Sequence, residues 1–140
     1  MTGTEPETIF YTADVVLVTE DGQIALVERR WEPFEGEHAL PGGHVDEKET
    51  SRMAASRELF EEAGVEVAPT DLEQLGVFDE PDRDPRGRYV TVVYLARVPA
   101  GTVLTAGDDA RTATWWPLTS LPPLAFDHAD ILGAVADRIA

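Results

Sequence analysis

The sequence contains no cysteine and few basic residues, and each shortage excludes some ligands or partners. Without cysteine the chain has no disulfides and no thiolate metal ligands, which suits a reducing compartment. Eleven Lys and Arg stand against 27 Asp and Glu, so the net charge of -16 argues against a nucleic-acid duplex as partner. No stretch approaches the roughly 20 apolar residues of a membrane span. The first ten residues also lack the basic start and apolar run of a secretory signal. We therefore expect a cytoplasmic protein with no membrane partner.

The composition is that of a globular domain, with 140 residues of which 43% are hydrophobic and 27% charged. We expect residues 1–140 to form one α/β domain. Apolar and β-branched segments predict strands over residues 9–18, 23–30, 72–77, 89–98 and 112–116. Helical spacing of apolar residues predicts helices over residues 51–63 and 126–139.

The stretch from Gly43 to Val65 holds the predicted helix over residues 51–63. Thr50 has the residue type and position of an N-cap, and Gly64 those of the first residue after the helix. The residues of this helix that we expect to contact the core are Met53, Ala55, Leu59, Phe60 and Ala63.

Three glutamates gather near the end of this helix. Side chains three and four positions apart share a face, so Glu58 lies next to both Glu61 and Glu62. Water, a proton on one carboxylate or a bound divalent cation would each offset their repulsion. The glycines that follow Pro41 let a backbone carbonyl approach a metal, and the negative end of the helix favours carboxylates that hold a cation. The alternative is a solvated acidic surface.

An arginine accompanies these acids. Arg57 precedes Glu58 directly and lies eight residues after Glu49, so its guanidinium could bind Glu49 as a fork. That pairing would fix the orientation of the neighbouring carboxylates.

The spacing of these residues matches a known signature at every defined position: Gly43, five residues, Glu49, seven residues, Arg57-Glu58-Leu59, one residue, Glu61-Glu62, one residue, Gly64-Val65. The chain thereby resembles the Nudix hydrolase family. The resemblance implies an α/β/α sandwich with a mixed β-sheet between helices. It also implies hydrolysis of a nucleoside diphosphate linked to another moiety, with Mg²⁺ or Mn²⁺ as cofactor.

The same resemblance implies roles for individual residues. Glu58, Glu61 and Glu62 would bind the metal, with the Gly42 carbonyl as a further ligand. Arg57 and Glu49 would be the orienting pair. Members of the family often carry an additional acid outside the signature, as metal ligand or general base. Asp108 and Asp109 are our candidates and Glu80 a weaker one, although turn chemistry explains Gly107-Asp108-Asp109 equally well.

Arginines outside the signature are candidates for substrate binding. Arg29 and Arg30 end the predicted strand over residues 23–30, where one of them could reach a phosphate or both could cap an exposed surface. Arg83 and Arg86 lie in a loop over residues 79–88 that is either a substrate-binding loop or a solvated, self-neutralising one.

Pro81, in the same loop, stands sixteen residues after Val65. This spacing resembles that of the ADP-ribose pyrophosphatases within the family. The resemblance implies that the loop arginines engage the diphosphate or the terminal ribose. Phe126-Asp127-His128 also resembles a segment of these relatives, but neither His128 nor His44 or Asp14 receives a role from the sequence.

The leading functional hypothesis is hydrolysis of ADP-ribose to AMP and ribose 5-phosphate. The first alternative is another Nudix substrate, such as an oxidised nucleoside triphosphate, a nucleotide sugar or a dinucleoside polyphosphate. The second is a non-catalytic ADP-ribose sensor. Because the relatives that hydrolyse ADP-ribose are often dimers, a homodimer is also an expected partner state.

Overall fold

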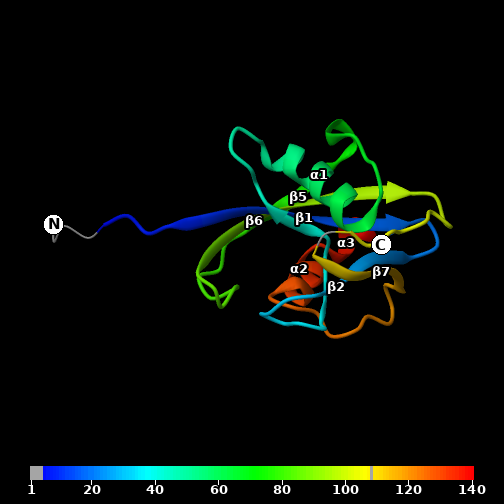
Figure 1. The fold of residues 1–140 in the computed structure, drawn as a ribbon. Helices are drawn as coiled ribbons and strands as arrows, with labels where there is room; N and C mark the ends of the chain where they lie inside the picture. The colour runs from blue at the N-terminus through cyan, green and yellow to red at the C-terminus, as the bar shows by residue number, and fades with distance from the viewer. Residues whose placement is uncertain (1–4, 108) are drawn as a thin grey trace.

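The computed structural model describes residues 5–107 and 109–140, and within them a β-sheet lies between helices (Figure 1). The strands are β1 (Ile9–Thr19), β2 (Gln23–Arg29), β3 (His38–Ala39), β4 (Gly42–His44), β5 (Glu73–Phe78), β6 (Arg88–Val98) and β7 (Ala110–Pro117). The helices are α1 (Ser51–Ala63), the 3₁₀ turn η1 (Pro69–Asp71), α2 (His128–Ala134) and α3 (Ala136–Ile139).

The sheet is mixed. Its main path runs β3-β2-β1-β6-β5, with β4 also paired to β1 and β7 to β2. β1 and β6 are parallel along their whole length, from Ile9 opposite Arg88 to Thr19 opposite Val98, whereas the other pairs are antiparallel. β1 is therefore the central strand, and β4 brings the glycine turn directly against it.

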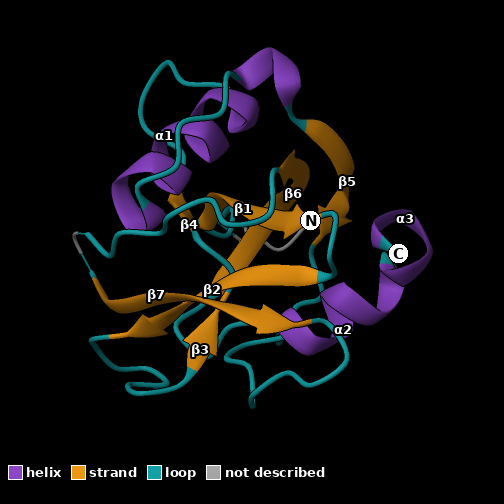
Figure 2. Cartoon of the chain, turned by 90° about the vertical axis from the view of Figure 1, so that its right-hand side faces the viewer, coloured by secondary structure: helices purple, strands orange, loops and turns teal. Residues whose placement is uncertain are grey.

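Alternate residues of β1 enter two separate cores, as the period of two in a strand requires. Val15 and Leu17 pack with Leu59 of α1 on one face of the sheet. Val16 packs with Ile131 of α2 on the opposite face. Figure 2 shows α1 on one side of the sheet and α2 with α3 on the other. The predicted α/β/α sandwich is confirmed.

Helix α1 has the predicted bounds. The Thr50 side chain accepts a hydrogen bond from the Met53 N–H at 3.1 Å. At the other end Gly64 adopts the left-handed conformation, with φ 72°, and donates to the Phe60 carbonyl. Both ends are thus capped by the residues that the sequence indicated.

The predicted core face of α1 is partly wrong. Met53 and Phe60 are 46% and 56% exposed, and lie on the solvent side of the helix. Seven residues apart, they share one face, and that face points away from the sheet. The buried residues are instead Ser51, Ala54, Ala55, Leu59 and Ala63. Small residues let α1 lie close to the strands that carry the glycine turn.

The carboxy-terminal helix differs from its predicted form. Instead of one helix over residues 126–139, α2 and α3 are separated at Val135, just after Gly133, a weak helix former. Phe126 precedes α2 in a left-handed conformation, with φ 54°.

Among the described residues, no helix combines the length and apolarity needed to cross a bilayer.

Candidate active site

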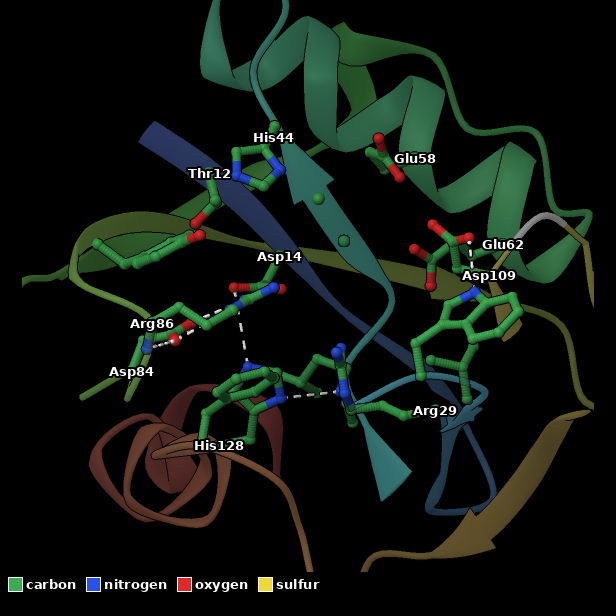
Figure 3. A pocket seen from close by; sticks show the side chains of 18 of the residues that line it. Thr12, Asp14, Arg29, His44, Glu58, Glu62, Asp84, Arg86, Asp109 and His128 are labelled. Carbon is green, nitrogen blue, oxygen red and sulfur yellow. Dashed lines mark hydrogen bonds and ion pairs between the residues drawn. The ribbon is translucent and has the colours of Figure 1, made fainter. Parts of the chain in front are cut away.

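A cavity of about 300 Å³ opens beside the glycine turn (Figure 3). Two glutamates of α1, Glu58 and Glu62, line it together with Gly42. Arg29 from the end of β2 and Arg86 from the loop before β6 also line it. Acidic and basic side chains that lie far apart in the sequence therefore meet around one cavity.

Arg57 holds the acidic cluster from behind the cavity. Its Nε and Nη2 donate to the two oxygens of Glu49 at 2.7 and 2.9 Å, which is the fork expected from the sequence. Its Nη1 donates to Glu58 Oε1 at 2.8 Å and to Glu61 Oε2 at 3.0 Å. Nη2 also donates to the His44 carbonyl at 2.9 Å, so one guanidinium ties α1 to the glycine turn. The hydrogen bond from Arg57 lowers the pKa of Glu49.

Glu58 is pressed against the glycine turn. A Cβ atom added at Gly43 would lie 2.6–2.7 Å from the Glu58 carboxylate, so only glycine fits here without displacing that group. Burial raises the pKa of Glu58, and the adjacent Arg57 opposes this rise. The Glu58 carboxylate therefore lies directly against the backbone of the turn, with no room for a side chain at Gly43.

Glu62 has the most strongly shifted carboxyl group of the cavity wall. Burial, followed by the nearby Glu58, Asp14 and Asp109, raises its pKa to about 9, and Arg29 opposes the rise. Negative charge is thus concentrated where Glu62 meets the cavity. A cation would relieve that crowding, because hard divalent ions prefer carboxylate and carbonyl oxygens.

The third glutamate of the predicted trio lies elsewhere. Glu61 pairs with Arg57, its side chain is 37% exposed, and it is absent from the cavity wall. Within residues 5–107 and 109–140, no three carboxylates or imidazoles converge as a preformed cation site. The structure therefore brings Glu58 and Glu62 together beside Gly42, and these oxygens are of the type that fits Mg²⁺ or Mn²⁺.

Two arginines share the ring of Phe126. The guanidinium carbons of Arg29 and Arg86 lie 4.8 and 5.2 Å from the ring centroid. Arg86 also forms a fork with Asp84, at 3.0 and 2.7 Å. Burial, and next the charge of Arg86, lowers the pKa of Arg29. Asp84 already supplies one negative charge beside this pair, and an anionic ligand next to Arg29 would supply another.

The remaining residues predicted to bind substrate are Arg83, Arg30 and Pro81. Arg83 is 8% exposed and forms a bidentate pair with Asp127, at 3.0 and 2.7 Å. Its charge is therefore already engaged, although it borders the cavity. Arg30 is exposed and also lines the cavity, whereas Pro81 is exposed and lies outside the wall.

Asp109 lines the cavity, and its Oδ1 accepts a hydrogen bond from the Trp31 indole at 3.2 Å. Asp108, the neighbouring candidate for the additional acid, lies outside the described residues. Glu80 does not belong to the cavity wall. Of the three acids considered outside the signature, the structure places Asp109 beside Glu62.

The three residues that received no role from the sequence, Asp14, His44 and His128, all line this cavity. Asp14 of β1 is 8% exposed and accepts a hydrogen bond from the Thr91 hydroxyl at 2.6 Å. His128, at the start of α2, is 4% exposed. A polar residue inside an apolar strand, as at Asp14, was the available signal for the first. For His128 the sequence offered only its tripeptide context.

Comparison with known proteins agrees with this geometry. The NUDIX domain matches residues 9–135. The chain therefore belongs to the Nudix hydrolase family, as its signature indicated. It is 44% identical over 116 residues to an ADP-ribose pyrophosphatase of Methanocaldococcus jannaschii. The aligned region covers 83% of this chain and 67% of that protein.

Two further relatives represent other protein contexts. The chain is 36% identical to the ADPR responsive transcriptional repressor NtrR of Acinetobacter baylyi over 91% of its own length, but over only 53% of the repressor. It superposes with a TM-score of 0.86 and 29% identity on a bifunctional NMN adenylyltransferase/ADP ribose pyrophosphatase of Francisella tularensis complexed with AMP and a Mn ion. That match covers 98% of this chain and 44% of the bifunctional protein.

Proposed function

We propose that the chain is a pyrophosphohydrolase that cleaves ADP-ribose to AMP and ribose 5-phosphate with Mg²⁺ or Mn²⁺. The observation that carries the proposal is the position of the Glu58 and Glu62 carboxylates and the Arg29 and Arg86 guanidinium groups around one cavity. The Methanocaldococcus ADP-ribose pyrophosphatase supports the choice of substrate.

Each group has a distinct task in this proposal. Glu58, Glu62 and the Gly42 carbonyl would hold the metal, and Glu61 would join them only if it left Arg57. When bound, the ion would polarise a phosphoryl oxygen and lower the pKa of the attacking water. The Arg57–Glu49 fork keeps Glu58 in place for that task.

The chemistry is a hydrolysis at phosphorus. A water oxygen adds to one phosphorus of the diphosphate, and the bond from that phosphorus to the bridging oxygen breaks. Arg29 and Arg86 would neutralise charge on the phosphoryl oxygens, since guanidinium groups bind them in a forked geometry. Asp109, which lines the cavity, would accept the proton of the water.

The local arginines also answer a difficulty that the composition raises. A chain with a net charge of -16 would repel an anionic nucleotide at long range. A bound divalent cation together with Arg29 and Arg86 would offset that repulsion at short range, where the diphosphate would lie.

A second candidate function is ADP-ribose sensing without catalysis. The similarity to the transcriptional repressor of Acinetobacter baylyi favours this candidate. The complete signature and the engaged Arg57 network favour the enzyme. Another Nudix substrate, such as an oxidised nucleoside triphosphate or a nucleotide sugar, is the nearer alternative.

A nucleotide panel with Mg²⁺, with Mn²⁺ and with EDTA tests these proposals. We expect ADP-ribose to turn over fastest and EDTA to abolish turnover. Glu62→Gln should abolish it as well, whereas Glu66→Gln, at an exposed position beyond α1, serves as the matched control. Faster turnover of another nucleotide would overturn the choice of substrate. Binding of ADP-ribose by the wild type without release of AMP would identify a sensor.

A further inference from the structure

The tripeptide Phe126-Asp127-His128 presents one polar group that the proposed reaction does not use. His128 is 4% exposed and lines the cavity. Its Nδ1 accepts a hydrogen bond from the Leu40 N–H at 3.0 Å. A backbone N–H can only donate, so Nδ1 carries no proton, and in the neutral ring the proton is on Nε2. Burial lowers the pKa of His128, which favours that neutral form.

The Nε2–H group faces Asp14. The distance from Nε2 to Asp14 Oδ2 is 3.9 Å, too long for a hydrogen bond, and the imidazole's hydrogen bond within the described residues is the one at Nδ1. Thr91 donates to the same Asp14 oxygen at 2.6 Å and holds the carboxylate in place. Figure 3 shows His128 and Asp14 facing one another in the cavity. A fixed donor and a fixed acceptor therefore stand side by side.

We propose that His128 and Asp14 form a subsite for one hydroxyl group of a sugar in the substrate. The inference rests on the proposed function, because it assigns this subsite to a ribose of the nucleotide. An oxygen placed about 2.8 Å from both Nε2 and Oδ2 would accept from His128 and donate to Asp14. The separation of 3.9 Å permits both contacts at once.

Other ligand groups fit this pair less well. A phosphate oxygen could accept from His128 but would be repelled by the Asp14 carboxylate, whereas Arg29 and Arg86 offer positive charge elsewhere in the cavity. His128 cannot serve as a general base in this arrangement, because Nδ1 is occupied by Leu40 and Nε2 already bears a proton. A hydroxyl uses both members of the pair, as it donates and accepts.

His128→Asn separates the two functions of the imidazole. The amide oxygen of asparagine can replace Nδ1 as the acceptor for Leu40, but asparagine is too short to supply the donor at Nε2. His128→Gln places an amide donor near the Nε2 position and tests for rescue. His38→Asn is the matched control, because His38 lies outside the cavity wall.

The assay measures kcat/KM for ADP-ribose and for analogues that each lack one hydroxyl of either ribose. We expect His128→Asn to reduce kcat/KM for ADP-ribose roughly tenfold, mainly through KM, as expected for one lost hydrogen bond in a buried site. For the one analogue that lacks the contacted hydroxyl, the same substitution should have almost no effect. That analogue identifies which ribose occupies the subsite. His128→Gln should recover part of the loss.

An equal loss for ADP-ribose and every analogue, or no loss at all, would overturn the subsite. Retention of the thermal unfolding midpoint in His128→Asn shows that a loss does not come from unfolding. Absence of wild-type turnover with ADP-ribose is a separate result, which overturns the proposed substrate. The same series is then run with hydroxyl-deleted analogues of the nucleotide that the panel selects.

Discussion

Replacing Glu62 with Gln should stabilise the metal-free protein at every pH well above 5 and should also remove activity. Burial and neighbouring acids raise the pKa of Glu62 to about 9 in the folded protein, from an ordinary value of 4.5. Between these two values the folded state retains a proton that the unfolded state releases. The free energy of unfolding must therefore fall as the pH rises through this range.

The size of the effect follows from the same two values. Each pH unit between the two pKa values contributes about 1.4 kcal/mol. Because pH 7 lies about 2.5 units above the ordinary pKa, the upper estimate is about 3.5 kcal/mol. The Glu62 side chain is only half-buried, so relaxation of the protein and contact with water reduce this energy. We therefore expect a stability difference of about 1–3 kcal/mol. Glutamine has the same shape without the charge, so Glu62→Gln should exceed the wild type by that amount at pH 7 and match it near pH 5.

Urea unfolding in EDTA at several pH values from 5 to 9 measures this difference. Glu61→Gln is the matched control, because it removes a half-exposed carboxylate that pairs with Arg57 and should cost about 0.5 kcal/mol. Added Mg²⁺ should stabilise the wild type more than Glu62→Gln, by preferential binding to the folded state. If Glu62→Gln shows the wild-type pH dependence in EDTA, the crowding of negative charge at Glu62 is not what the structure indicates.

Three other substitutions, with Gly133→Ala as a control for one of them, test the surrounding geometry. Arg57→Lys should lower the free energy of unfolding by about 1–2 kcal/mol and reduce kcat, because one ammonium cannot replace a forked guanidinium; unchanged urea unfolding and kcat would contradict this. Gly42→Ala should destabilise the protein by more than about 2 kcal/mol, because its Cβ would collide with the β1 backbone. Gly133→Ala has open space around it and should stabilise by up to about 1 kcal/mol. Thermal unfolding measures both. Arg83→Gln should cost about 3 kcal/mol in urea unfolding by leaving Asp127 unpaired, and a loss confined to KM would instead favour direct substrate binding.

Much of the fold was predictable because it depends on local chemistry. Thr50 and Gly64 carry the bounds of α1 in their own side chain and backbone preferences. The continuous apolar run of β1 is typical of a strand buried on both faces, and the glutamate spacing of α1 follows the period of a helix. The exposure of Phe60 was not predictable in this way, because the sequence does not show which face of α1 packs against the sheet.

The sequence by itself determined the family, the α/β class, the ends of α1 and the Arg57–Glu49 fork, because short spacings along one helix and its flanking turn define them. Only the tertiary structure decided which groups share the cavity. It turned Glu61 toward Arg57, engaged Arg83 with Asp127, and brought Asp14 within 3.9 Å of His128. Asp14 and His128 stand 114 positions apart, and their meeting depends on how β1 and α2 pack across the sheet, which no local pattern encodes.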